Sequence, residues 1–132
     1  MARVARWAAL GGRAWDSGPV VIYKILLPSE WAEFQAKGEF VGSAHDLRDG
    51  FVHLSSRDQV AETARRVFSA EPELIVAAVD TDAVAPWLRW EESASRGASF
   101  PHVYAPLPLS AVGEVYHVAG ATEIDTALPP AD

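Results

Sequence analysis

The sequence contains no cysteine, and this absence excludes several kinds of scaffold and site. Without thiols, the chain forms no disulfide framework, binds no metal through thiolates and has no cysteine nucleophile. The apolar stretch near the first residue is also shorter than the roughly 7–15 residues of a secretory signal. We therefore expect a protein of the reducing cytoplasm.

Long apolar runs are missing as well. The longest run covers residues 20–27, where it is interrupted by Lys24 and then ended by Pro28. A helix needs about 20 consecutive apolar residues to span a bilayer. We therefore expect no membrane insertion.

Basic residues are scarce: 11 Lys and Arg face 18 Asp and Glu, which gives a formal net charge of −7. Residues 20–119 carry 8 basic and 14 acidic side chains, whereas residues 1–19 have a net charge of +2. Proteins that bind nucleic acid nonspecifically rely on clustered Lys and Arg. The charge therefore argues against a nucleic-acid partner.

The residues that are present suffice for one domain, since 49% of the 132 residues are hydrophobic. Glycine and proline interrupt the first twenty residues, and Pro129 and Pro130 lie in a C-terminal stretch with little periodicity. We predict a folded domain at residues 20–119, a flexible N-terminal extension at residues 1–19 and a flexible tail at residues 120–132.

The opening segment VVIYKILL predicts a buried strand whose Tyr23 and Lys24 point to opposite faces. A short helix should follow, capped by Ser29 and ended by Gly38. Further along, GFVHLSS predicts a second strand with Val52 on the core face and His53 on the other.

A second helix is expected after Ser56 and Gln59, which have the spacing of a capping box. Its apolar stripe consists of Val60, Ala64, Val67 and Phe68. LIVAAV has the composition of a central strand buried on both faces, and FPHVY and GEVYHV supply two more short strands. The pattern is α/β or α+β; we favour α+β, with small, split antiparallel sheets and two or three helices.

Polar aromatic and imidazole side chains on these strands are the candidates for chemistry. A neutral His53 offers one donor and one acceptor to a ligand, and its alternative is a half-buried histidine bonded to a neighbouring carbonyl. His102 and Tyr104 share one face of FPHVY, where a structural histidine and a core tyrosine are the alternative. We predict that His53, His102 and Tyr104 line one pocket, with Glu91 at its rim.

Glu91 and Glu92 follow Trp87 and Trp90 in what we expect to be a loop. A carboxylate beside indole rings can stabilise a developing cation, although solvated loop acids are the simpler interpretation.

Several residue types could bind a metal, but no HxH, HExxH or carboxylate ladder sets a local ligand spacing, and we predict no metal site. The donors available are His45, His53, His102, His117, Asp46, Asp49 and Glu91. Motifs of the GxSxG, GxGxxG and GxxxxGK types are also missing from the sequence.

Six segments follow one another along the chain: IYKI, the Trp31 helix, DGFVHLSS, LIVAAVD, WEES and FPHVYAPLPLSAV. Their order and spacing resemble those of the bacterial domain of unknown function 952 over about residues 21–118. Ala105 departs from the pattern, because the family tends to have glycine there. The family name itself implies no activity.

A more distant similarity links the leading strand, G-x-V-H-L-S and the aliphatic strand ending in Asp to the RNA 2′-phosphotransferase branch of the ADP-ribosyltransferase-like fold. This resemblance implies a small-molecule ligand, NAD, held between two small antiparallel sheets. It assigns NAD contacts to His53, Ser55, Tyr104 and Tyr23, and catalytic roles to His53 and to His102 or Glu91.

Removal of an RNA 2′-phosphate is disfavoured, because that branch needs several arginines and this domain is acidic. Three hypotheses remain. The chain is an ADP-ribosyltransferase or NAD glycohydrolase, a noncatalytic module that binds a nucleotide-like ligand, or a structural or interaction protein without a cleft.

Overall fold

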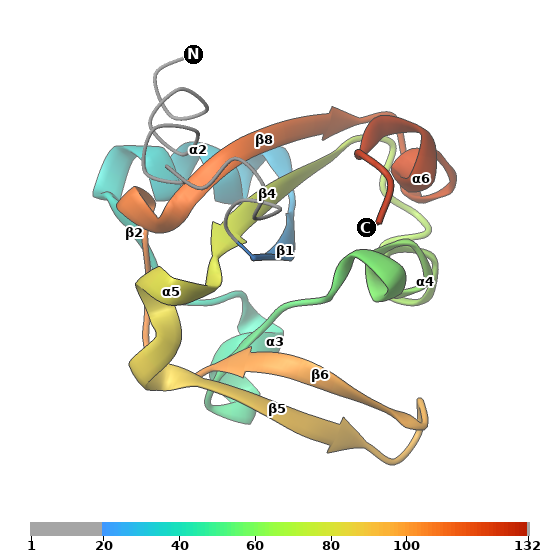
Figure 1. The fold of residues 1–132 in the computed structure, drawn as a ribbon. Helices are drawn as coiled ribbons and strands as arrows, with labels where there is room; N and C mark the ends of the chain where they lie inside the picture. The colour runs from blue at the N-terminus through green and yellow to red at the C-terminus, as the bar shows by residue number, and fades with distance from the viewer. Residues whose placement is uncertain (1–19, 132) are drawn as a thin grey trace, which may run out of the picture.

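Antiparallel pairing organises the strands of residues 20–131, which are the residues that this computed structural model describes (Figure 1). One three-stranded sheet has the order β1-β4-β8, and a second has the order β3-β6-β5. The first sheet consists of β1 (Val21–Leu26), β4 (Leu74–Asp80) and β8 (Val112–Val118). The second consists of β3 (Val52–His53), β5 (Leu88–Ser93) and β6 (Ala98–Val103). The predicted split into small antiparallel sheets is confirmed.

A short ribbon, β2 (Glu39–Phe40) with β7 (Leu107–Pro108), completes the strands. The helices are α2 (Pro28–Lys37), α3 (Ala44–Asp49), α4 (Arg57–Val67), α5 (Thr81–Val84) and α6 (Ile124–Ala127). Single 3₁₀ turns are η1 (Ala85–Trp87), η2 (Leu109–Ala111) and η3 (Ala121–Glu123). The described residues thus contain more helices than the two or three predicted.

Local sequence explains where the first helix begins and ends. α2 starts at Pro28, whose fixed φ suits the first helical position, so the cap is Leu27 and not Ser29 as predicted. The Leu27 N–H donates to Glu30 Oε1 at 2.8 Å. Gly38, at φ 79°, ends the helix in the left-handed conformation that glycine adopts without strain.

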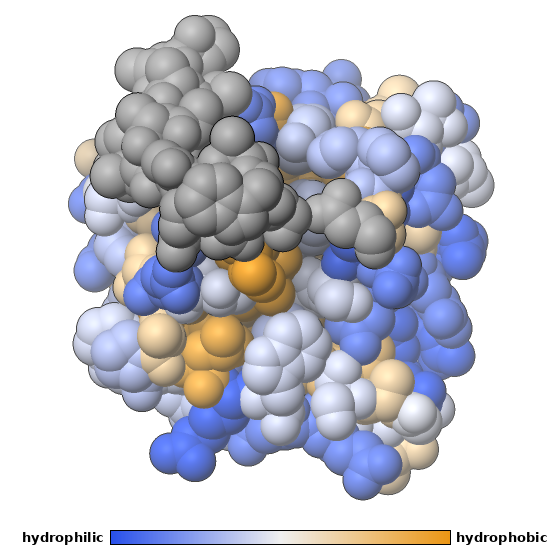
Figure 2. Space-filling model, viewed as in Figure 1, coloured by the Kyte–Doolittle hydropathy of each residue, from blue (hydrophilic) through white to orange (hydrophobic). Residues whose placement is uncertain are grey.

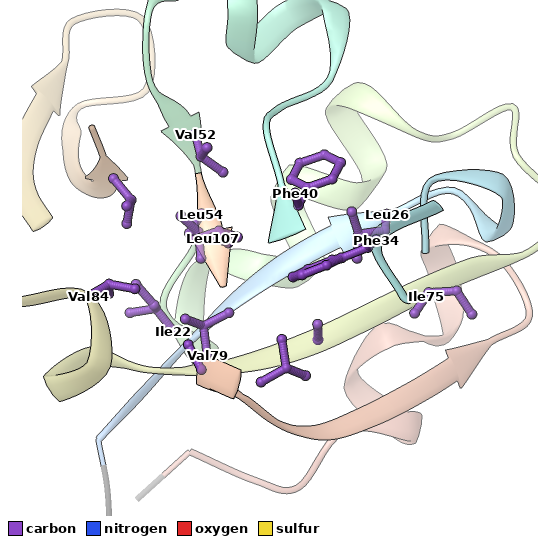
Figure 3. Packing of buried hydrophobic residues seen from close by; sticks show 14 residues of the cluster. Ile22, Leu26, Phe34, Phe40, Val52, Leu54, Ile75, Val79, Val84 and Leu107 are labelled. Carbon is purple, nitrogen blue, oxygen red and sulfur yellow. The ribbon is translucent and has the colours of Figure 1, made fainter. Parts of the chain in front are cut away.

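β4 is the middle strand of the first sheet, and every residue from Leu74 to Val79 is buried, as the apolar run predicted. One face of this sheet packs on a cluster that includes Ile22, Leu26, Phe34 and Val79 (Figure 3). The other face packs on α4 and the C-terminal segment through a second cluster that includes Tyr23. Lys24 and Tyr23 therefore lie on opposite faces of β1, as expected.

Three further predictions are wrong. Glu91 and Glu92 lie on β5 and not in a loop, because β5 pairs with β6 along its whole length. Val67 is 60% exposed, because the buried face of α4 is formed by Val60, Ala61 and Ala64.

The third correction concerns the C-terminal boundary. The folded domain does not end at residue 119, because η3 and α6 pack on α4 and β8 and bury Ile124 and Leu128. The predicted N-terminal extension, residues 1–19, lies outside the described residues.

The described part of the chain is therefore a mixed α and β fold with small antiparallel sheets and several helices. In that part no helix combines the length and apolar character that a membrane span requires. In the view of Figure 2, hydrophilic residues dominate the right side and lower edge, and apolar residues gather near the centre.

Candidate functional site

A cleft of about 470 Å³ is lined by residues from both three-stranded sheets. β1 contributes Tyr23 and Lys24, while the second sheet contributes His53 on β3 and His102 on β6. The remaining walls come from α3, from α4 and from the β5–β6 turn. This cleft does not fit the third hypothesis, which was a structural or interaction protein without a cleft.

The two sheets meet at one isolated bridge beside the cleft. The Tyr23 N–H donates to the Ser55 carbonyl at 2.7 Å, and the Ser55 N–H donates to the Tyr23 carbonyl at 2.9 Å. Both residues line the cleft, but they are only 5% and 2% exposed. The Ser55 hydroxyl donates to Thr63 Oγ1 on α4 at 3.1 Å.

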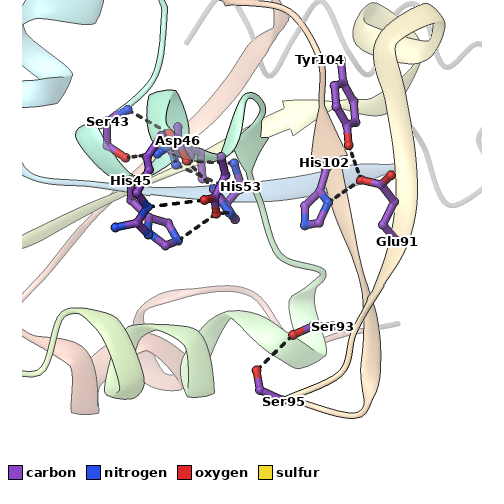
Figure 4. A network of polar contacts seen from close by, with 12 residues as sticks. Ser43, His45, Asp46, His53, Glu91, Ser93, Ser95, His102 and Tyr104 are labelled. Carbon is purple, nitrogen blue, oxygen red and sulfur yellow. Dashed lines mark hydrogen bonds and ion pairs between the residues drawn. The ribbon is translucent and has the colours of Figure 1, made fainter.

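Asp46, in the first turn of α3, is the centre of the polar network (Figure 4). Its Oδ2 accepts from Lys24 Nζ and from the Ser43 N–H, both at 2.9 Å. Its Oδ1 accepts from the His53 N–H at 3.0 Å and contacts His53 Nδ1 at 2.7 Å. One buried carboxylate thus joins β1, the start of α3 and β3.

The charge of Asp46 is stabilised by its partners. Burial alone raises the pKa of this carboxyl, but the hydrogen bond from His53, the charge of Lys24 and the Ser43 N–H together outweigh burial. The pKa of Asp46 therefore lies well below its ordinary value. Lys24 Nζ also donates to the His53 carbonyl at 3.0 Å, so a buried ion pair holds β3 against β1.

His53 lies between two carboxylates. Its Nδ1 contacts Asp46, and its Nε2 lies 3.0 Å from Asp49 Oδ2. The His45 and Phe51 rings flank it, at centroid distances of 4.4 and 4.6 Å. These contacts fix the orientation of the imidazole.

His102 is the cross-strand neighbour of His53, and the centroids of the two rings are 5.4 Å apart. Its Nδ1 lies 2.7 Å from Glu91 Oε1, and the Tyr104 hydroxyl donates to the same oxygen at 2.7 Å. Both hydrogen bonds lower the pKa of Glu91, and the one from Tyr104 has the larger effect. Glu91 is therefore ionised at neutral pH. Phe51 stacks on His102 at 4.0 Å.

The predicted site residues do not all share one cavity. His53, His102, Ser55 and Tyr23 line the cleft, whereas Tyr104 borders a smaller hollow of about 200 Å³. Glu91 is not part of the cleft lining either, and it reaches the cleft through His102. The register places Glu91 opposite Phe100 on β6, two positions along from the Arg89–His102 pair, so that Glu91 reaches His102 diagonally across the two strands.

Sequence reasoning missed Arg96 and the importance of Asp46. Arg96 lines the cleft, donates from Nη1 to Thr63 Oγ1 at 2.9 Å and lies 4.2 Å from the Phe100 ring centroid. Its burial lowers its pKa. Ser43 and Asp46 have capping-box spacing, and this signal could have placed Asp46 at a helix start.

Comparison with known proteins gives one family. The family model described as protein of unknown function (DUF952) matches residues 25–115. The crystal structure of protein CC0527 from Caulobacter crescentus is 45% identical, with a TM-score of 0.69 over 73% of this chain and 83% of that chain. Its solution NMR structure is 40% identical, with a TM-score of 0.68 over 80% and 95% of the two chains. None of the curated proteins compared with the chain matches it. The chain therefore belongs to the DUF952 family.

Proposed function

We propose that the cleft binds NAD and that the protein transfers or hydrolyses its ADP-ribosyl group. The observation that carries this proposal is the cross-strand pair His53 and His102, two imidazoles on one cleft wall that are each held by a carboxylate. The resemblance to the ADP-ribosyltransferase-like fold supplies the chemistry, and the side chains of the site must carry the function. The experiment tests binding and reaction separately.

The reaction breaks the bond between ribose C1′ and the nicotinamide nitrogen. Nicotinamide leaves with the bonding electrons, and the ribose passes through a cation-like transition state before an acceptor oxygen bonds to C1′ and loses its proton. Such a transition state gains most from fixed negative charge and from exclusion of water. The carboxylates of Glu91 and Asp46 supply this negative charge. Glu91 does so through the imidazole of His102, and Asp46 does so through the imidazole of His53.

The side chains have different parts in this proposal. Nδ1 of His102 is hydrogen-bonded to Glu91, so Nε2 is the ring nitrogen that contacts the ribose. Glu91 and Tyr104 are positioning residues, since neither lines the cleft. Tyr23 and Ser55 shape the wall at the junction of the sheets.

The cleft also offers a group for the rest of a dinucleotide. Arg96 lines it and presents a planar guanidinium that can bind a diphosphate. Lys24 is already neutralised by Asp46, so among the described residues that line the cleft Arg96 is the Lys or Arg side chain that remains for the diphosphate.

A noncatalytic ligand-binding module is the second candidate. The polar network favours it, because the Asp46 carboxylate is fully occupied by protein donors and connects β1, the start of α3 and β3. A binding module needs the cleft and Arg96 but does not need His102 to be oriented by Glu91.

Calorimetric titration with NAD, ADP-ribose and nicotinamide, followed by a nicotinamide-release assay, tests both candidates. We expect NAD to bind, His102→Ala to abolish release, and Glu91→Gln to slow release more than it weakens binding. His117→Ala removes an exposed imidazole on β8, outside the cleft lining, and is the matched control. Binding without release supports the noncatalytic module, and absence of binding by all three compounds contradicts both candidates.

A further inference from the structure

We propose that His45, Asp49 and His53 form a binding site for a divalent transition-metal ion of the Zn²⁺ type. One ligand atom from each side chain lies within 4.8 Å of the other two. Asp49 Oδ2 is 3.0 Å from His53 Nε2 and 3.6 Å from His45 Nε2. Tetrahedral zinc has bonds of about 2.0–2.2 Å, so its ligand atoms are roughly 3.3–3.5 Å apart. Small side-chain rotations therefore bring the three groups to metal-binding geometry.

The local fold brings these ligands together. His45 and Asp49 are four residues apart on α3 and so lie on one face of that helix. Gly50 ends α3 at φ 88°, and the chain then returns along β3 to place His53 beside them. The prediction of no metal site rested on the absence of HxH, HExxH and carboxylate-ladder motifs; the spacing here is a histidine, an aspartate and a histidine at positions 45, 49 and 53.

A second observation comes from the other side of the His53 ring. Histidines that bind metals usually donate their second ring N–H to a carboxylate, which fixes the tautomer. Asp46 is buried and contacts His53 Nδ1 at 2.7 Å, in the position that such a carboxylate occupies (Figure 4). Nε2, the other ring nitrogen, faces Asp49 Oδ2 at 3.0 Å and is the atom that would bind the ion.

The donor set and its exposure also suit a metal. The side chains of His45, Asp49 and His53 are 53%, 34% and 28% exposed, so an ion can reach them from solvent. All three line the cleft. Two imidazoles and a carboxylate are the protein ligands of open zinc sites, where the remaining position takes water or a ligand.

Arg48 competes with the ion for the same side chains. Its Nη2 contacts His45 Nδ1, and its Nε lies 3.5 Å from Asp49 Oδ1. Coordination through His45 Nε2 moves the ring proton to Nδ1, so the contact with Arg48 must be given up. We therefore expect Arg48→Ala to bind the ion at least as tightly as the wild-type protein.

Calorimetric titration of chelator-treated protein with Zn²⁺ tests the site without any nucleotide, so the result does not depend on the proposed NAD chemistry. We expect one equivalent to bind, and His45→Ala and Asp49→Asn to weaken binding by about tenfold or more. Both substituted side chains are at the surface of α3, and circular dichroism checks that each variant is folded. The matched controls are His117→Ala and Asp58→Asn, which remove exposed groups outside this cluster and should retain wild-type affinity.

Co²⁺ gives an independent readout, because tetrahedral Co²⁺ has intense visible absorption bands. We expect these bands with the wild-type protein and with Arg48→Ala, and their loss with His45→Ala. Equal Zn²⁺ affinity in the wild-type protein and in both ligand variants would overturn the proposal. Failure of the wild-type protein to bind one equivalent would overturn it as well.

Discussion

At the scale of single residues, Asp46 makes more hydrogen bonds and ion pairs than its position in the first turn of a helix suggests. An acid in the first turn of a helix is ordinary, because it interacts favourably with the helix dipole. Here the same carboxylate also accepts from Lys24 and from two nitrogens of His53. Its loss would leave the Lys24 ammonium group buried without its ionic partner, since that side chain is 7% exposed.

We expect Asp46→Asn to lower the free energy of unfolding by about 3–5 kcal/mol, as breaking a buried ion pair does. Urea denaturation measures this change. Asp58→Asn is the matched control, because Asp58 is an exposed acid in the first turn of α4 and its loss should cost less than about 0.5 kcal/mol. Equal losses in the two variants would show that the network around Asp46 is not a source of stability.

The lowered pKa of Asp46 also predicts acid sensitivity. Its folded pKa lies below its unfolded value of 3.8, so the stabilisation is present above that value and is lost as pH falls through the folded pKa. We expect the free energy of unfolding of the wild-type protein to fall below pH 4 more steeply than that of Asp46→Asn. Urea titrations at a series of acid pH values, in the presence of a chelator, measure both slopes. Parallel slopes would contradict the assignment.

At the scale of secondary-structure elements, pairing and packing override weak local signals. The segment around Trp87 and Trp90 reads as an irregular loop, yet β5 forms there because β6 offers it a complete antiparallel partner. The C-terminal segment lacks periodicity, yet Ile124 on α6 and Leu128 just after it pack into the cluster under α4. Arg57 on α4 adds an ion pair with Asp125 at 2.7 Å.

We expect Ile124→Ala to lower the free energy of unfolding by about 2–5 kcal/mol, because it deletes a fully buried side chain. Thr126→Ala, on an exposed position of the same short helix, is the control and should change stability little. Thermal or urea denaturation distinguishes the two. If a chain that stops at residue 119 is as stable as the full chain, the packing of the C-terminal segment contributes nothing to stability.

At the scale of the whole molecule, two small sheets are joined at the cleft. The reciprocal hydrogen bonds between Tyr23 and Ser55 and the Lys24 contact with the His53 carbonyl connect the first sheet to the second. Tyr23, Lys24 and Ser55 at this connection are buried, whereas the β5–β6 hairpin extends away from the first sheet (Figure 1). The cleft walls therefore depend on a few contacts between parts far apart in sequence.

We expect the amide hydrogens of Tyr23 and Ser55 to exchange with solvent as slowly as that of Val76 in the central strand, because all three should open only on global unfolding. Hydrogen exchange followed by NMR measures this. The amide of Ser95, an exposed residue in the β5–β6 turn, is the fast-exchanging reference. Fast exchange at Tyr23 and Ser55 would mean that the two sheets separate without unfolding.

The sequence by itself determined the strands with strong alternation or continuous apolar composition, since burial follows directly from those patterns. It placed Val52 in the core and His53 on the opposite face, and it identified the middle strand and the helix end at Gly38. These features depend on neighbours within a few residues, and local periodicity records them.

Only the tertiary structure decided how the site is assembled. Asp46 and Lys24 are 22 residues apart, and His102 and Glu91 are 11 apart, so their pairing depends on strand register and not on local pattern. Tyr104, just after the end of β6, likewise borders the smaller hollow and not the cleft. An extended strand alternates its faces but does not specify which strand lies beside it, and for that physical reason the polar network could not be read from the chain alone.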